Sequence, residues 1–170
     1  MPDISKSENR IKSLDRMREE QFLFVYGTLR RGVLKAGRLE EVMTQDAEYT
    51  GPARAAGRLY WVSSYPGYVM TQGQGEWVSG ELYRIVNPDR LFGQLDRYEG
   101  CSSEDPQPHE YERIRTEVYE MNGRETEAWV YHYTGDLRGE ERILSGDFFQ
   151  PECLPEQQTS RAVNQNAKEE

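Results

Sequence analysis

The sequence contains no long hydrophobic run, which excludes a protein that crosses a membrane with helices. Such a helix needs roughly 20 consecutive apolar residues, and no stretch of the 170-residue chain comes near this length. The N-terminus also lacks the apolar core of a secretory signal peptide. The mean hydropathy is −0.90. We therefore expect no membrane partner and a cytoplasmic location.

Cysteine and histidine are both scarce. The two cysteines, Cys101 and Cys153, are too few for a disulfide framework, so reduced thiols are expected. The two histidines, His109 and His132, have no partners at the spacings typical of metal ligands. The sequence therefore predicts neither a disulfide-stabilised fold nor a metal site.

Positive charge is in deficit, with a formal net charge of −9. Met1–Glu20 carries five acidic and five basic residues, and Glu156–Glu170 carries three acidic and two basic residues, so the chain between them carries −8. Binding to nucleic acid or to anionic membranes needs a basic surface, and neither partner is expected. A small anionic substrate would have to be held by local dipoles or by a few arginines.

Motifs for nucleotides and for common nucleophiles are missing as well. There is no phosphate-binding Gly-x-x-x-x-Gly-Lys loop and no Gly-x-Gly-x-x-Gly turn. No Gly-x-Ser-x-Gly elbow of a serine hydrolase is present. We therefore expect no cofactor, and no independent nucleophile is visible.

The length and the polar ends indicate a single domain. Residues 1–20 are expected to form a polar N-terminal tail or a short helix, because apolar residues are scattered there. A narrow helical stripe within this segment consists of Ile11, Leu14 and Met17. Residues 21–155 are expected to form the domain, and residues 156–170 a polar C-terminal tail.

Short apolar or alternating runs, separated by Gly, Pro and Asp, predict strands. These runs are Phe22–Tyr26, Ala47–Gly51, Ala55–Val62, Trp77–Val86, Glu112–Tyr119 and Glu125–Tyr133. The last two flank Asn122-Gly123, a strong hairpin signal. Ser63–Tyr68, which contains Pro-Gly, is expected to be a turn. Ile143–Pro151 is expected to be a final ordered stretch.

One helix is clearly signalled. Asn87 can cap its start, Pro88 suits its first turn, and Gly100 suits its end. Its inward face would consist of Leu91, Phe92 and Leu95. Gly37–Val42 has weaker helical character. Strands outnumber helices and do not alternate with them, so we predict an α+β fold with a curved or barrel-like, mixed or mostly antiparallel sheet.

The stretch "FVYGTLRRG", Phe24–Gly32, allows two interpretations. It can be a strand and a turn with solvated arginines. It can also be a ligand-binding turn, because successive backbone N–H groups can converge on an anion and Gly27 allows close approach. In the second interpretation, Arg30 and Arg31 could add a fork to a carboxylate.

The stretch "LDRYEG", Leu95–Gly100, places a glutamate at the end of the predicted helix. The negative end of a helix and partial burial both raise the pKa of a carboxyl group, which suits general acid/base chemistry. Glu99 can equally be a solvated surface group, since 30% of the chain is charged. Asp96 lies one helical turn away and can tune its charge. Cys101 is expected to be a small packed thiol.

Seven motifs, in this order, resemble the γ-glutamylcyclotransferase-like superfamily, which includes γ-glutamylamine cyclotransferases and AIG2-like proteins. They are "VYGTLRRG", "YPGY", "GELYRI", "LDRYEG", "YERIRTEV", "AWVYHY" and "ILSGDF". The resemblance covers about Phe22 to Phe149. It implies a small β-barrel with flanking helices and one cavity, and a small-molecule γ-glutamyl substrate.

The resemblance also implies roles for particular residues. The loop Tyr26-Gly27-Thr28-Leu29 would line the cavity and hold the γ-glutamyl head through backbone groups. Glu99 would be the catalytic acid/base, and Tyr111 would help to line the site. Tyr133 is a further candidate for substrate binding, with Tyr131 as its competitor.

The implied reaction is intramolecular. The α-amine of a γ-glutamyl amine or γ-glutamyl amino acid attacks the γ-carbonyl, which gives 5-oxoproline and the free amine. Two alternatives stay open: a non-catalytic domain that binds a small carboxylate or a peptide in the same cavity, and a hydrolase that releases glutamate. The stretch "VLKAGRLEE", Val33–Glu41, departs from the family pattern, and the oligomeric state is not predicted.

Overall fold

The computed structural model describes residues 20–35, 37–72 and 75–152. The predicted polar ends, residues 1–20 and 156–170, lie outside the described residues except for Glu20. The stripe of Ile11, Leu14 and Met17 and the second cysteine, Cys153, also lie outside them. The elements are β1 (Phe22–Val25), α2 (Arg38–Asp46), β2 (Ala47–Val62), β3 (Tyr65–Met70), β4 (Trp77–Ile85), α3 (Pro88–Tyr98), β5 (Tyr111–Glu120), β6 (Glu125–Tyr133) and β7 (Glu141–Ile143).

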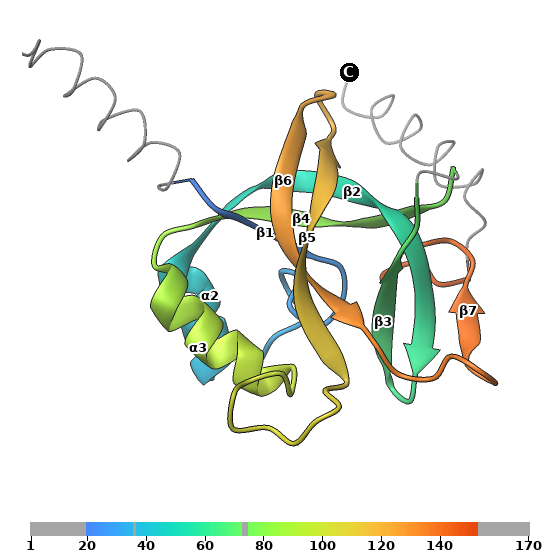
Figure 1. Cartoon of the computed structure of the whole chain (residues 1–170). Coiled ribbons are helices and arrows are strands. Elements are labelled where there is room, and N and C mark those ends of the chain that lie inside the picture. Colours follow the sequence, from blue (N-terminus) through green and yellow to red (C-terminus); the bar gives the residue numbers. More distant parts are fainter. Residues whose placement is uncertain (1–19, 36, 73–74, 153–170) are drawn as a thin grey trace, which may run out of the picture.

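Five strands close into a barrel in the order β1-β4-β2-β3-β6, with β6 returning to β1. The pairings of β6 with β1 and with β3 are parallel, and the other pairings are antiparallel. β5 forms the predicted hairpin with β6 and also pairs with β2, while β7 adds to β2. The helices α2 and α3 lie side by side against one side of the barrel (Figure 1). The predicted α+β fold, with a small mixed barrel and flanking helices, is confirmed.

Alternation along β1 separates two hydrophobic clusters. Phe24 belongs to a cluster built almost wholly from strand residues, which fills the barrel. Leu23 and Val25 belong to the other cluster, which includes the buried faces of α2 and α3. Both faces of β1 are therefore buried, which explains its continuous apolar sequence.

Two sequence predictions about the strands were wrong. Ala47–Gly51 and Ala55–Val62 form one strand, because the register against β4 shifts between Tyr49 and Gly51 while pairing continues. Gly-Pro thus bends the strand without ending it. The expected turn at Ser63–Tyr68 is confined to Ser63-Ser64, and β3 begins at Tyr65.

The predicted helix and its signals are confirmed. The Asn87 side chain accepts a hydrogen bond from the N–H of Arg90, and Pro88 lies in the first turn. The weaker helical signal after Gly37 corresponds to α2. Among residues 20–35, 37–72 and 75–152, no helix has the length and apolar character needed to cross a membrane.

Candidate active site

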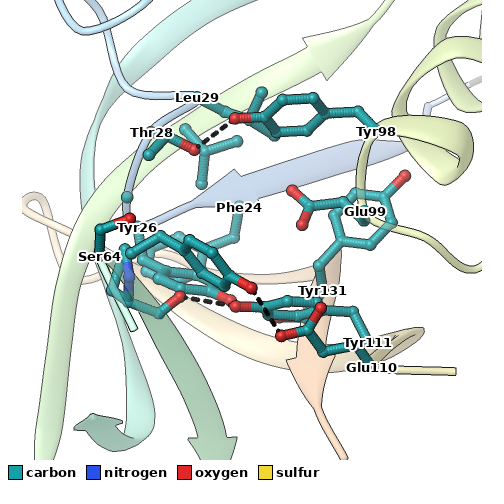
Figure 2. A pocket seen from close by; sticks show the side chains of 14 residues that line it. Phe24, Tyr26, Thr28, Leu29, Ser64, Tyr98, Glu99, Glu110, Tyr111 and Tyr131 are labelled. Carbon is teal, nitrogen blue, oxygen red and sulfur yellow. Dashed lines mark hydrogen bonds between the residues drawn. The ribbon is translucent and has the colours of Figure 1, made fainter. Parts of the chain in front are cut away.

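One cavity opens between the loop that follows β1, the start of β3, the end of α3 and the start of β5 (Figure 2). Its volume is about 340 Å³, which is within the range of small-molecule sites. The residues around it are Phe24, Val25, Tyr26, Gly27, Thr28, Leu29, Ser64, Tyr65, Pro66, Tyr98, Glu99, Glu110, Tyr111 and Tyr131.

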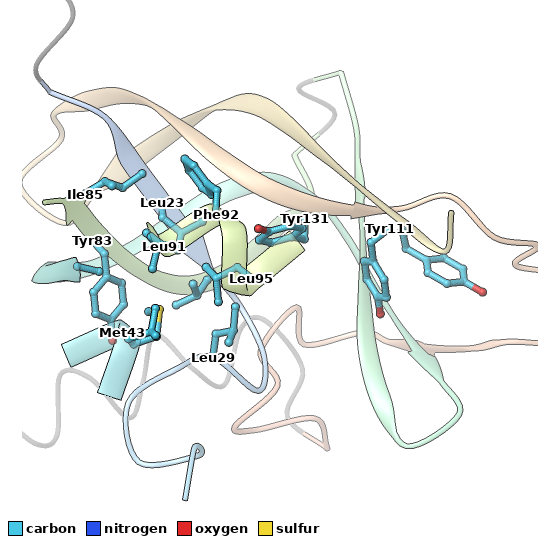
Figure 3. Packing of buried hydrophobic residues seen from close by; sticks show 14 of the residues in the cluster. Leu23, Leu29, Met43, Tyr83, Ile85, Leu91, Phe92, Leu95, Tyr111 and Tyr131 are labelled. Carbon is cyan, nitrogen blue, oxygen red and sulfur yellow. The ribbon is translucent and has the colours of Figure 1, made fainter. Parts of the chain in front are cut away.

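Helix α3 presents Glu99 to this cavity. The helix packs on the barrel through its apolar face of Leu91, Phe92 and Leu95 (Figure 3). Glu99 is its C-cap, and Gly100 follows in the left-handed conformation with φ of 71°. The N–H of Gly100 donates to the carbonyl of Arg97, and the N–H of Cys101 donates to the carbonyl of Asp96. This pair of bonds is a Schellman cap, and it fixes the backbone that carries Glu99.

The environment of Glu99 favours its neutral form. Burial, followed by the neighbouring charges of Glu110 and Asp96, raises the pKa of Glu99 to about 8. Burial raises it because the charged form loses hydration. No hydrogen bond from residues 20–35, 37–72 or 75–152 reaches its carboxyl group. Glu99 therefore keeps its oxygens available to a ligand and exchanges a proton near neutral pH.

Asp96 is held by the protein itself. Its carboxylate accepts two hydrogen bonds from Arg113, at 3.0 and 3.2 Å, and one from the hydroxyl of Tyr131 at 2.7 Å. The guanidinium of Arg113 also lies over the ring of Phe92, 3.8 Å from its centroid. Asp96 thus influences Glu99 through its charge, while its oxygens are engaged elsewhere.

The loop after β1 forms a tight turn opposite Glu99. The N–H of Arg30 donates to the carbonyl of Gly27 at 3.0 Å, which leaves Thr28 and Leu29 in the centre of the turn. The central N–H groups of such a turn are not used by the turn itself. In the described parts of the chain, no acceptor takes a hydrogen bond from the N–H of Thr28 or Leu29. Two backbone donors at the cavity wall are thus available.

The close packing of the loop on β3 explains its glycine. A Cβ atom on Gly27 would lie 2.5 Å from Cγ of Pro66, so any larger residue would push the loop and β3 apart. Pro66 in turn accepts a hydrogen bond on its carbonyl from the Tyr111 hydroxyl at 3.0 Å. The turn, β3 and β5 are therefore joined beside the cavity.

Tyrosine hydroxyl groups hold the cavity walls. Tyr26 donates to the carbonyl of Tyr131 at 2.7 Å, and burial raises the pKa of Tyr26 and of Tyr111, so both stay protonated donors. At the cavity edge, the Tyr98 hydroxyl lies 3.1 Å from Oγ1 of Thr28, which links the end of α3 to the turn.

The structure brings most of the predicted site residues together. This cavity is lined by Tyr26, Gly27, Thr28, Leu29, Glu99 and Tyr111. Tyr133 does not line it, because its ring packs against Tyr111 with 5.4 Å between centroids, and Tyr131 lines the cavity instead. The sequence reasoning missed Tyr98, Glu110 and the segment Ser64–Pro66. The "YPGY" motif pointed to the last of these.

The two arginines of the stretch do not line the cavity. Arg30 binds Asp147 at 2.8 Å and lies 3.7 Å from Glu81, both within the protein. Arg31 places its guanidinium over the ring of Tyr49, 3.5 Å from the centroid. The interpretation of these arginines as a fork for a ligand carboxylate was wrong, because buried protein carboxylates and an aromatic ring already occupy them.

Cysteine and metal chemistry find no support in the described residues. The Cys101 thiol lies beside Asp96, and burial raises the pKa of Cys101 to about 12, which leaves it a thiol at neutral pH. Residues 20–35, 37–72 and 75–152 contain no group of three or more His, Cys, Asp or Glu side chains that could hold a metal ion.

The fold and the cavity together define a class of protein. Its members are small closed barrels of mixed topology, and in their cavity a carboxyl group with a raised pKa lies opposite a glycine-containing turn. Comparison with known proteins agrees with this class. The family model "Gamma-glutamyl cyclotransferase, AIG2-like" matches residues 23–150. The chain belongs to this family, and the resemblance inferred from its motifs is confirmed.

Three similar proteins are between 24% and 28% identical to this chain. Gamma-glutamylaminecyclotransferase A of Danio rerio is 28% identical over 113 residues, which are 64% of this chain and 66% of that protein. The protein YtfP of Escherichia coli is 27% identical with a TM-score of 0.52, covering 78% of this chain and all of that one. An AIG2-like protein of Mus musculus shares the fold at 24% identity and a TM-score of 0.53, covering 68% of this chain and 78% of that one.

Proposed function

We propose that this protein is a cyclotransferase that converts a γ-glutamyl amine or a γ-glutamyl amino acid into 5-oxoproline and the free amine. The observation that carries the proposal is the pairing of Glu99 with the Tyr26–Leu29 turn across one cavity. Membership of the family supports it. So does the name of the zebrafish relative, gamma-glutamylaminecyclotransferase A.

In the first step, Glu99 acts as a base. The substrate enters with its α-amino group as an ammonium ion, and the Glu99 carboxylate takes one proton from it. The nitrogen lone pair then attacks the γ-carbon, and a five-membered ring forms as the γ-oxygen becomes an oxyanion. Because nucleophile and carbonyl belong to one molecule, holding the substrate in a folded conformation supplies much of the rate.

In the second step, Glu99 acts as an acid. The bond between the γ-carbon and the leaving nitrogen breaks, and that nitrogen takes the proton from the Glu99 carboxyl group. The remaining extra proton of the ring nitrogen passes to the freed amine through water. A chain-terminal α-amino group has a pKa of about 8, and the carboxylate beside the substrate amine raises the pKa of that amine. The raised pKa of Glu99, about 8, brings the two groups closer together, which lowers the cost of the proton transfer.

The turn supplies hydrogen bonds to the substrate in this mechanism. The N–H groups of Thr28 and Leu29 bind the α-carboxylate or the developing γ-oxyanion. Gly27 keeps the turn close to Pro66, and so keeps these donors at the wall. A substrate carboxylate held in this way needs no arginine, which fits the absence of basic residues among those that line the cavity.

The first test is product analysis with purified protein and a panel of γ-glutamyl amines and γ-glutamyl amino acids. We expect release of 5-oxoproline from at least one class. Free glutamate as the product would support a hydrolase instead. Tight binding without turnover would support the non-catalytic alternative, in which the cavity holds a small carboxylate or a peptide.

The pH dependence tests the role of Glu99 as a base. With a γ-glutamyl alkylamide whose leaving group carries no charge, we expect kcat/KM to fall about tenfold per pH unit below a pKa near 8, because only the carboxylate form of Glu99 accepts the proton of the substrate ammonium. Glu110→Gln removes a negative charge that raises the pKa of Glu99. In this variant the fall of kcat/KM on the acidic side of the pH profile, the acidic limb, should therefore begin at lower pH. Glu112→Gln, on an exposed residue outside the cavity, should leave the limb in place.

A limb near the ordinary pKa of a glutamate, about 4.3, would contradict this assignment. So would a limb that Glu110→Gln does not move. The free substrate ionises in the same way with the wild type and with both variants. A difference between their pH profiles therefore reflects the ionisation of a group of the enzyme.

A further inference from the structure

The carboxyl groups that line the cavity have no basic counterpart among the other residues that line it. Of its fourteen lining residues, Glu99 and Glu110 are acidic and none is Lys, Arg or His. The chain between the polar ends adds a formal charge of −8, which draws cations rather than anions towards it. An anionic leaving group would meet repulsion in this cavity without a basic partner.

Glu110 occupies the outer part of the cavity. It is exposed, whereas Glu99 is partly buried and Phe24 and Tyr26 are buried. Its Oε1 accepts a hydrogen bond from the Tyr65 hydroxyl at 2.8 Å, which orients the carboxylate and leaves further acceptor positions open. A γ-glutamyl head held by the turn and Glu99 would direct its leaving group outwards, to Glu110.

The walls beside Glu110 are aromatic. The rings of Tyr65 and Tyr111 lie with their centroids 6.4 Å apart, and Tyr98 lines the opposite edge beside Thr28 (Figure 2). Aromatic faces attract ammonium groups and accept alkyl chains. A carboxylate and several tyrosine rings together are complementary to an alkyl chain that ends in an ammonium ion.

We propose that the leaving group is a cationic amine, an alkyl chain with a second ammonium group and no carboxylate, and that Glu110 determines this specificity. The inference rests on the proposed cyclotransferase function and narrows it. Amino acids as leaving groups are disfavoured. Their α-carboxylate is attached to the carbon next to the scissile amide nitrogen, so it would lie in the cavity close to Glu99 and Glu110 without a basic partner.

The test compares three γ-glutamyl amides whose leaving amines have matched length and differ in the terminal group. These amines are 1,4-diaminobutane, pentylamine and 4-aminobutanoate, which end in an ammonium, a methyl and a carboxylate group. We expect kcat/KM for the ammonium substrate to exceed that for the methyl substrate about fivefold, as an exposed ion pair allows, and to exceed that for the carboxylate substrate more strongly.

Variants assign the preference to Glu110. Glu110→Gln should bring the ammonium-to-methyl ratio close to one, whereas Glu112→Gln, the same change outside the cavity, should keep it. The ratio between substrates cancels any effect of either variant on the ionisation of Glu99. Added salt should reduce the ratio in the wild type, because it screens an exposed pair.

The outcomes separate the two proposals. If all three substrates give 5-oxoproline at equal rates, or if the carboxylate substrate is preferred, the specificity proposal is overturned and the cyclotransferase stands. A preference for ammonium that survives Glu110→Gln overturns the role of Glu110. If none of the three, nor any amide of the first panel, gives 5-oxoproline, both proposals fall.

Discussion

Glu99→Gln is expected to lower the rate of 5-oxoproline formation by about 10²- to 10⁴-fold, the usual contribution of a general acid/base. Glutamine has nearly the same shape as glutamate and can occupy the same place at the end of α3, but it neither takes a proton from the substrate ammonium nor returns it to the leaving nitrogen. The measurement is kcat at saturating substrate at pH 8, close to the pKa of Glu99 in the free protein.

The same variant should fold at least as stably as the wild type. The folded protein holds the proton of Glu99 up to about pH 8, while the unfolded chain releases it near pH 4.3. Glu99 therefore lowers stability progressively as the pH rises between these values. Its neutral replacement removes this penalty, so thermal unfolding at pH 7 should show no loss of stability. Inactivity then cannot be attributed to unfolding.

Glu104→Gln is the matched control, because it changes an exposed glutamate in the loop between α3 and β5. It should keep wild-type activity. If Glu99→Gln retained more than about a tenth of the wild-type rate, Glu99 would not be the acid/base, since that loss is far below the general acid/base range. The proton would then have to move through another group of the cavity or through water.

Local signals explain why Glu99 and the turn could be found from the sequence. The C-terminal cap of α3 needs only Gly100 in a left-handed conformation, so "EG" after an amphipathic helix fixes the place of the glutamate. The turn after β1 likewise depends on Gly27. The helix cap and the turn each depend on a few neighbouring residues, so their sequence motifs were sufficient to predict them.

Long-range register explains what the sequence could not give. Tyr131 and Tyr133 lie on the same face of β6, so a period of two cannot distinguish them. In the hairpin, Tyr131 lies opposite Arg113 and Tyr133 lies opposite Tyr111. This register between β5 and β6 determines that the ring of Tyr131, and not that of Tyr133, lines the cavity.

Glu110 gave no signal of its own. It is one of 30 acidic residues, at the end of an irregular loop. What brings it to the cavity is the path of the chain between α3 and β5, together with the hydroxyl of Tyr65 from another strand. Neither is encoded by the neighbours of Glu110 in the sequence.

Arg30→Leu is expected to destabilise the protein by about 3 kcal/mol, as removing one partner of a buried ion pair does. The side chain of Arg30 is 11% exposed, and those of its partners Asp147 and Glu81 are 14% and 8% exposed. Its guanidinium also lies over the ring of Phe149 at 3.6 Å from the centroid. Leucine fills part of the space but leaves two carboxylates without their counter-charge.

The loss of stability in Arg30→Leu should lie at the low end of the range for broken buried ion pairs. The reason is that both carboxylates keep hydrogen bonds from other donors. Glu81 accepts hydrogen bonds from the N–H of Arg31 and from the Tyr83 hydroxyl, each at 3.0 Å. Asp147 accepts one from the N–H of Phe149 at 2.9 Å. These bonds offset part of the desolvation of the charges, and they remain in the variant.

Urea unfolding gives the free energy of unfolding, and Arg31→Leu is the neighbouring control. Arg31 is exposed and stacks on Tyr49, so its loss should cost no more than about 1 kcal/mol. Asp147→Asn should be costly in the wild type and nearly neutral in Arg30→Leu, because the charge it removes has by then lost its partner. Equal losses for Arg30→Leu and Arg31→Leu would mean that Arg30 is not what joins the turn to the segment around Asp147.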